Sequence, residues 1–138
     1  MTLDIDYSLH YKRWHNGSYD ELLKRKDFYH RLLGKELQNL PKNVNVLDYG
    51  CGFGHFTFYL FGIFDYVTGV DASIEQIEIA KKNNLPVQHL AIENFELWVE
   101  ENTQKFDIIF LMDVFEHVPV EYQIQFMRSL NKTLKSNW

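Results

Sequence analysis

Cysteine is almost absent from this sequence. The one cysteine, Cys51, cannot form a disulfide within the chain, and no second cysteine is available to build a paired-cysteine zinc site. Such low cysteine usage is typical of proteins from a reducing compartment. We therefore expect a cytoplasmic protein whose fold depends on packing rather than on cross-links.

Positive charge and long apolar runs are also scarce. The 14 lysines and arginines are outnumbered by 19 acidic residues, which leaves a net charge of -5. Because such a chain has no general field that attracts phosphate backbones or anionic membranes, a nucleic-acid partner is disfavoured. No segment approaches the roughly 18 apolar residues of a membrane span, and residues 1–10 lack the basic start and apolar run of a secretory signal.

The chain does contain enough apolar material for one core. At 138 residues and 46% hydrophobic content, it is too short for two ordinary domains. Stretches of strand length alternate with stretches of helical period, which predicts an α/β fold with a parallel sheet and right-handed crossovers. We expect helices over about residues 18–33, 55–64, 73–82, 92–101 and 119–134, and strands over residues 44–49, 66–70, 86–90 and 106–112.

Two of these boundaries have specific signals. Gly34 is a candidate stop for the first helix, with a continuation to residue 40 left open. Ser73 is suited to cap the helix that ends at Lys82. The run 106–112 is apolar apart from Asp107, which is the pattern of a fully buried parallel strand.

The most informative segment is the glycine-rich loop after the first predicted strand. Gly50, Gly52 and Gly54 alternate with other residues just after Asp48. Glycines let the backbone turn sharply and approach a ligand closely, where a Cβ would collide. In an open α/β sheet such a loop lies at the carboxyl ends of the strands, where ligands bind. Asp71 ends the next strand, and its carboxylate can accept hydrogen bonds from two vicinal ribose hydroxyls.

Residues 44–118 resemble the class I S-adenosylmethionine-dependent methyltransferases. The segment VLDYGCGFG at 46–54 resembles motif I of that family, and VTGVD at 67–71 resembles motif II. The segment 106–118 resembles motif IV of its ubiquinone-biosynthesis-type and small-molecule O-methyltransferase branches. The resemblance implies a Rossmann-like sheet of order 3-2-1-4 with helices on both faces, S-adenosylmethionine as cofactor, and O-methylation of a small-molecule acceptor.

The resemblance also implies roles for individual residues. Asp48 would lie near the ammonium of the cofactor, directly or through water, and Ala72 and Ser73 would line its adenosine side. The acidic residue that often binds the adenine amino group in relatives is replaced here by Ala91, so adenine recognition would use the backbone around Ile92, or Glu93 in a register shifted by two. The predicted cofactor-binding residues are Asp48, Gly50, Cys51, Gly52, Gly54, Asp71, Ala72, Ile92 and Met112.

A dinucleotide-binding module is the nearest alternative, since it also combines a glycine loop with a later acidic residue. Its fingerprint requires glycine at the position of His55. The bulky Phe53, His55 and Phe56 stand where a pyrophosphate would approach the helix N-terminus. The spacing therefore favours the sulfonium cofactor over a dinucleotide.

The segment after the fourth predicted strand carries a second cluster of reactive side chains. Asp113, Glu116 and His117 are spaced at i, i+3 and i+4, so one helical turn would point them toward the same space. His117 is suited to act as a general base on an acceptor hydroxyl. The three residues are also suited to a divalent metal ion, or they cap the turn before Pro119. All three interpretations stay open here.

The remaining expectations concern the two ends of the chain. Residues 1–40 form an arm and a helix, and residues 41–138 form the cofactor-binding domain. The aromatic residues Tyr7, Tyr11, Trp14 and Tyr19 would cover the cofactor as a lid or pack on the core.

By resemblance, further strands would follow residue 138, so we expect a truncated fold whose fourth strand is an edge. Such an edge favours a homodimer, completion by other residues, or coverage by Trp138 and the last helix. A cofactor-binding fragment without turnover is therefore an alternative function.

Overall fold

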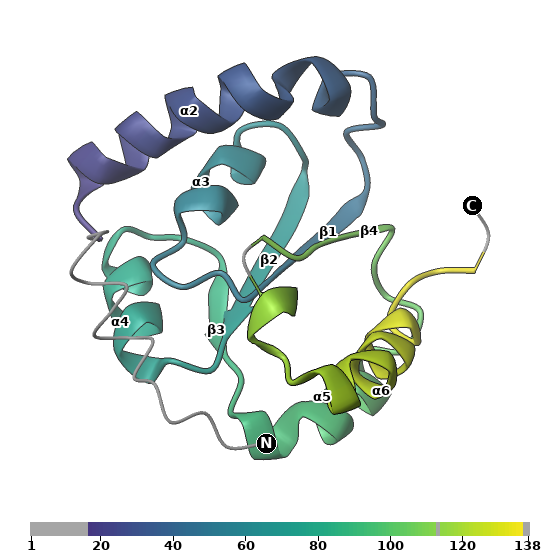
Figure 1. Ribbon diagram of the computed structural model, residues 1–138. Helices are drawn as coiled ribbons and strands as arrows, with labels where there is room; N and C mark the ends of the chain where they lie inside the picture. The colour runs from purple at the N-terminus through teal and green to yellow at the C-terminus, as the bar shows by residue number, and fades with distance from the viewer. Residues whose placement is uncertain (1–16, 113, 137–138) are drawn as a thin grey trace.

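The computed structural model describes residues 17–112 and 114–136 (Figure 1). Parallel strands alternate with helices along most of the chain, as the sequence predicts. The elements are α2 (Tyr19–Leu37), β1 (Asn45–Tyr49), α3 (His55–Phe61), β2 (Tyr66–Asp71), α4 (Ile74–Lys82), β3 (Val87–His89), the 3-10 helix η1 (Ile92–Asn94), α5 (Phe95–Glu101), β4 (Ile108–Phe110), the 3-10 helix η2 (Phe115–His117) and α6 (Val120–Asn131).

The four strands form one sheet in the order β3-β2-β1-β4, which confirms the predicted order. Every pairing is parallel, and Asp48 in β1 lies opposite Gly69 in β2 and Phe110 in β4. Because successive side chains of a strand point to opposite faces, Val46 packs into one apolar cluster and Leu47 into another. Helices α2, α3 and α4 cover the first face, and α5 and α6 cover the second (Figure 1).

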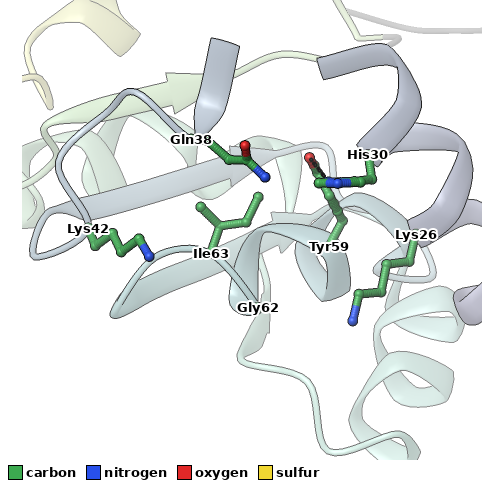
Figure 2. A pocket seen from close by; sticks show the side chains of 7 residues that line it. All are labelled: Lys26, His30, Gln38, Lys42, Tyr59, Gly62 and Ile63. Carbon is green, nitrogen blue, oxygen red and sulfur yellow. Dashed lines mark hydrogen bonds between the residues drawn. The ribbon is translucent and has the colours of Figure 1, made fainter. Parts of the chain in front are cut away.

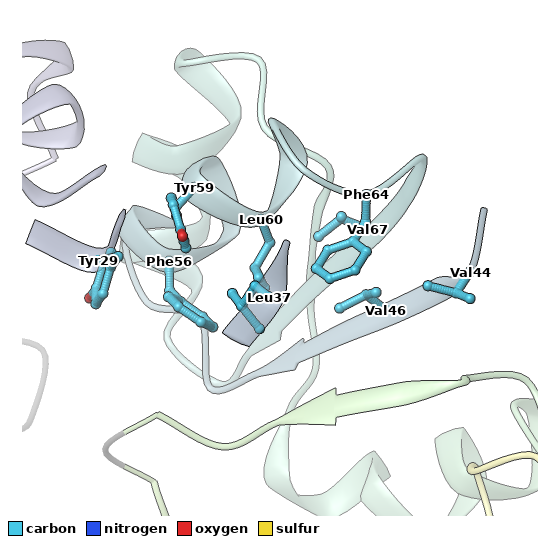
Figure 3. Close-up of a cluster of buried hydrophobic side chains, with 9 residues drawn as sticks. All are labelled: Tyr29, Leu37, Val44, Val46, Phe56, Tyr59, Leu60, Phe64 and Val67. Atoms are coloured by element: carbon cyan, nitrogen blue, oxygen red, sulfur yellow. The ribbon is translucent and has the colours of Figure 1, made fainter. Parts of the chain in front are cut away.

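Aromatic residues dominate the core between α2, α3 and the sheet (Figure 3). The ring of Tyr29 in α2 meets Phe56 in α3 edge to face, with centroids 4.8 Å apart. Tyr59 and Leu60 are buried in the same cluster. Burying side chains of this size stabilises a fold by about 1.5–3 kcal/mol each, so α2 is packed firmly onto the domain.

Serine caps begin two of the helices. The Ser18 hydroxyl accepts a hydrogen bond from the Glu21 amide at the start of α2. The Ser73 hydroxyl accepts one from the Gln76 amide at the start of α4, as predicted. Of the two ends left open for α2, the structure shows the continuation past Gly34. Gly34 is buried inside α2, and a side chain there would collide with the ring of His30, so the glycine serves packing and the helix continues to Leu37.

The fourth strand is shorter and more exposed than predicted. Ile108, Ile109 and Phe110 are each half-buried, whereas the apolar run indicated full burial. The reason is topological, because β4 has a partner strand only on its β1 side among the described residues. Similarly, residues 92–94 form a 3-10 turn before α5 rather than part of one continuous helix.

The chain after α6 lies beside the segment that precedes β4. The Phe106 amide donates to the Thr133 carbonyl at 2.9 Å, and the Lys135 amide donates to the Phe106 carbonyl at 2.8 Å. This parallel bridge covers the edge just before β4 and leaves Ile108–Phe110 beyond it. None of the helices in the described ranges is both long and apolar enough to cross a membrane.

Candidate functional site

The glycine loop connects β1 to α3 at the carboxyl end of the sheet. Gly50, Gly52 and Gly54 have φ angles of 80°, 55° and 87°, a region that side-chain-bearing residues rarely adopt. A Cβ on Gly50 would also collide with the side chain of Val114, and one on Gly54 would collide with Leu85. Glycine is therefore needed at all three positions for backbone conformation, and at positions 50 and 54 for space as well.

Backbone hydrogen bonds attach this loop to the end of β2. The amides of Gly50 and Cys51 both donate to the Val70 carbonyl, at 2.7 and 2.9 Å. The Gly54 amide donates to the Cys51 carbonyl at 2.8 Å and so closes the turn before α3. The loop is thus held in one conformation by its own backbone and by the neighbouring strand.

Asp71 stands at the end of β2, directly beside this loop. One of its carboxylate oxygens accepts a hydrogen bond from the Gly52 amide at 3.0 Å, and the other accepts one from the Ser73 amide at 2.8 Å. Burial raises the pKa of Asp71, while these two hydrogen bonds and the nearby His89 lower it. A carboxylate offers about four lone-pair sites, so the two backbone bonds orient Asp71 and leave acceptor capacity for two hydroxyl donors.

Asp48 is the second carboxylate of the site, and it is almost completely buried, with 1% of its surface exposed. The Thr57 hydroxyl, from the first turns of α3, donates to one of its oxygens at 2.7 Å. Burial raises the pKa of Asp48 to about 7, the Thr57 hydrogen bond opposes this shift, and the charge of Asp71 adds to it. A cationic group placed nearby would stabilise the ionised form of Asp48.

The other predicted cofactor contacts differ in exposure. Cys51 is buried, and burial together with the charges of Asp48 and Asp71 raises the pKa of its thiol, so a reactive thiolate is disfavoured. Ala72 is exposed, and its carbonyl lies 3.0 Å from Nε2 of His89. Ile92 is 52% exposed in η1, and Met112 is half-buried against the cluster under α3. These positions surround the carboxyl ends of β1 to β4.

The cluster after β4 is only partly described, because Asp113 lies outside the described residues. His117 and Glu116 are both in η2, and Nε2 of His117 lies 3.7 Å from Oε1 of Glu116, with 40% and 57% of their side chains exposed. The His117 amide donates to the Val114 carbonyl within the same turn. In the described part of the chain no group of three His, Cys, Asp or Glu residues is arranged to hold a metal ion.

Two polar residues of the site were missed by sequence reasoning. Thr57 is fully buried beside Asp48, and its signal was a small polar residue in the otherwise apolar and aromatic segment 55–61. His89 lies opposite Asp71 in the pairing of β2 with β3, and only that register places it here. Among the four aromatic residues expected to form a lid or pack on the core, Tyr19 is 56% exposed and meets Phe58 edge to face, whereas Tyr7, Tyr11 and Trp14 lie outside the described residues.

Comparison with known proteins places this geometry in a family. Residues 14–137 match a methyltransferase domain family. The chain is 34% identical over 128 residues to a protein named ubiquinone biosynthesis O-methyltransferase from Pelagibacter ubique, an alignment that covers 80% of this chain and 50% of that protein. This chain thus spans about half the length of that curated relative.

Solved structures show the same fold. A protein from Pyrococcus horikoshii OT3 aligns with a TM-score of 0.70 and 24% identity over 95% of this chain and 61% of its own. A plantazolicin methyltransferase solved in complex with a triazolic desmethylPZN analog and S-adenosylhomocysteine aligns with a TM-score of 0.62 and 25% identity, over 93% of this chain and 46% of its own. The family match, the curated relative and the shared fold confirm the resemblance seen in the sequence: the chain belongs to the methyltransferase domain family.

Proposed function

We propose that this chain binds S-adenosylmethionine at the carboxyl ends of β1 and β2. The observation that carries the proposal is Asp71, whose two oxygens are fixed by the amides of Gly52 and Ser73 and retain acceptor capacity for the ribose hydroxyls. The plantazolicin methyltransferase, which shares this fold, was solved with the product form of the same cofactor. Family membership and the residues present therefore agree on the ligand.

The methionine end of the cofactor is assigned to Asp48. It is buried next to the glycine loop, and its raised pKa of about 7 means that it would gain from a cationic partner such as an ammonium group. Ala72, Ser73 and the backbone at Ile92 are assigned to the adenosine side, and Met112 to the methionine side. The positive φ angles of Gly50, Gly52 and Gly54 keep side chains out of the space between these groups.

The reaction we propose is methyl transfer to a hydroxyl of a small molecule. When bound, the sulfonium cofactor supplies an electrophilic methyl group, so the protein must mainly position the acceptor and remove its proton. The support for an O-linked product is the name of the curated relative, an O-methyltransferase. His117 is assigned as the general base, because it is partly exposed after β4 and lies in contact with the carboxylate of Glu116.

Calorimetric titration tests the cofactor site. S-adenosylmethionine and S-adenosylhomocysteine should bind the wild-type protein saturably, and Asp71→Ala should weaken binding by roughly ten- to hundredfold, since charge-assisted hydrogen bonds contribute about 1.5–3 kcal/mol. Asp107→Ala is a matched control, because this carboxylate also accepts a backbone hydrogen bond but lies before β4, away from the loop. Absence of wild-type binding, or equal affinity in Asp71→Ala, would refute the proposed site.

A second candidate function is cofactor binding without turnover. It is favoured by one observation, namely that the chain spans half the length of the curated relative. Incubation with S-adenosylmethionine and a panel of catechols and other small hydroxylated acceptors distinguishes the two. Formation of S-adenosylhomocysteine that depends on the acceptor supports the enzyme, whereas tight binding without product for any acceptor supports the binding module.

The proposal also includes a homodimer and a cytoplasmic location. The half-buried strand Ile108–Phe110 supports a homodimer formed edge to edge, because an unpaired strand edge is a template for another strand. Light scattering should then show a mass that doubles with concentration, and a constant monomer mass would contradict the dimer.

The low cysteine usage, with the single Cys51 buried and free, supports a cytoplasmic location.

A further inference from the structure

Gly69 lies in the interior of β2, where a glycine usually weakens a strand because it offers no side chain to pack. No positive φ accounts for it, since the positive-φ glycines among the described residues all lie in the glycine loop. Space accounts for it instead. A Cβ on Gly69 would lie 2.7 Å from the hydroxyl oxygen of Thr57 and 2.9 Å from the Cβ of Cys51. These distances are well inside van der Waals contact, so a side chain here would displace its neighbours.

The hydroxyl of Thr57 fills the room that Gly69 leaves, and from there it reaches Asp48. Asp48 lies directly opposite Gly69 in the pairing of β1 with β2. The Thr57 hydroxyl donates to Oδ2 of Asp48 at 2.7 Å, and both side chains are almost completely buried. A threonine on a helix has few allowed rotamers, so a side chain at position 69 would turn the hydroxyl away from the carboxylate.

The backbone that carries Thr57 is fixed by contacts between α3 and α2. The ring of Phe56 meets that of Tyr29 edge to face, with centroids 4.8 Å apart. Tyr59 extends toward His30 beside the cavity between α2 and the end of α3, and its hydroxyl is 3.5 Å from Nδ1 of that histidine (Figure 2). These contacts hold α3 against the domain, so the hydroxyl of Thr57 occupies a set position beside the sheet.

We propose that Thr57 and Gly69 are positioning residues for the methionine end of the cofactor, and that they act by orienting the carboxylate of Asp48. This role rests on the proposed cofactor site and adds the residues that fix its contact with a cation. The Thr57 hydrogen bond occupies Oδ2 of Asp48 and leaves Oδ1 to accept from an ammonium group. Burial raises the pKa of Asp48 and the Thr57 hydrogen bond lowers it, so the hydroxyl also favours the ionised carboxylate.

Two ligands that differ at the methionine end test this role by calorimetry. S-adenosylhomocysteine carries the amino acid, and 5′-methylthioadenosine lacks it. Thr57→Val should weaken S-adenosylhomocysteine by about tenfold, the equivalent of one charge-assisted hydrogen bond, and should change the affinity for 5′-methylthioadenosine by less than about twofold. Thr57→Ser retains the donor and should recover most of the affinity. Gly69→Ala should reproduce the selective loss, because its Cβ displaces the same hydroxyl.

Thr133→Val is the matched control. Thr133 is also fully buried, and its hydroxyl also forms a hydrogen bond of 2.7 Å, but to the carbonyl of Leu130 at the end of α6. This variant should bind both ligands as the wild type does. A double-mutant cycle gives a second decision, because Thr57→Val should have little further effect on S-adenosylhomocysteine affinity in an Asp48→Asn background.

The outcomes separate the positioning role from the cofactor site itself. The role is overturned, and the site stands, if Asp71→Ala weakens binding while Thr57→Val changes neither affinity or lowers both equally. It is also overturned if Thr57→Val costs the same affinity with Asp48→Asn as without it, and this cycle decides alone if 5′-methylthioadenosine binds too weakly to measure. Wild-type affinity in a folded Gly69→Ala removes Gly69 from the role, and the threonine variants decide if Gly69→Ala does not fold. Absence of S-adenosylhomocysteine binding by the wild type overturns both proposals.

Discussion

The ends of β2 and β4 lie at the same edge of the sheet but are held very differently. At the end of β2, the carboxylate of Asp71 is fixed by two backbone amides, and the Val70 carbonyl holds the adjacent loop. After β4, Glu116 and His117 occupy one short 3-10 turn and are both partly exposed. Burial raises the pKa of Asp71 at the first end, and its hydrogen bonds fix its geometry, whereas the side chains at the second end are open to solvent.

The largest expected effect is the pH dependence of stability due to Asp48, the buried carboxylate of β1 beside the first end. Its folded-state pKa of about 7 exceeds the ordinary 3.8, so the folded state binds the proton more tightly than the unfolded chain does. Stability should therefore be greatest at acidic pH and fall as the pH rises from about 4 to about 7, by roughly 3–5 kcal/mol in total. Urea unfolding across this range should show the fall in the wild type and a flatter profile in Asp48→Asn. Equal slopes would contradict a raised pKa of the buried Asp48 carboxylate.

The next largest effect should come from the conformation of the glycine loop. Gly54→Ala places a Cβ at a φ of 87° and against the side chain of Leu85, which should destabilise the fold by about 2–4 kcal/mol. Gly62→Ala is the control, because Gly62 has a φ of -80° and its nearest neighbour to a new Cβ would be 3.6 Å away. Thermal unfolding should separate the two variants clearly. A similar loss in both would show that the loop conformation is not the cause.

A smaller effect should follow from removing the hydroxyl beside Asp48. Thr57→Val conserves shape but leaves the carboxylate without this donor, at a cost of about 1–3 kcal/mol. Because the hydroxyl stabilises the ionised carboxylate, the cost should grow as the pH rises through about 7. Thr57→Ser retains the donor and should restore most of the stability at high pH. A loss that does not depend on pH, or that serine fails to reduce, would point to packing alone.

The smallest effect on stability should be found after β4. His117→Gln should change the free energy of unfolding by less than about 0.5 kcal/mol, because this side chain is 40% exposed. If His117 is the general base, the same variant should lower the rate of S-adenosylhomocysteine formation by roughly a hundredfold or more. Glu116→Gln should have a weaker effect on that rate. Loss of activity on chelation, restored by a divalent ion, would instead favour the metal site.

Much of the fold could be predicted because local signals agreed with the tertiary structure. Ser73 caps α4 as its position before an apolar-periodic segment indicated, and the strand order follows from the alternating pattern together with the family resemblance. Gly34 illustrates a local signal that left two outcomes open. A glycine near a helix end usually marks a stop, but here close packing against His30 requires it inside the helix.

In the candidate site, too, some residues could be predicted from the sequence and others could not. Gly50, Gly52, Gly54 and Asp71 were recognisable, because their spacing reflects backbone conformations and hydrogen bonds that are short-range in the sequence or between neighbouring strands. Thr57 was not recognised, since its role depends on how α3 docks over Asp48.

The sequence by itself determined the alternation of strands and helices, the turn at the glycine loop and the placement of acidic residues at strand ends. These features depend on periodicity, backbone conformation and chain order, which are properties of the residues themselves. Only the tertiary structure decided the burial of Asp48, the half-exposure of β4 and the position of His89 opposite Asp71. Burial, edge position and strand register arise from contacts between segments distant in the chain, so no local pattern contains them.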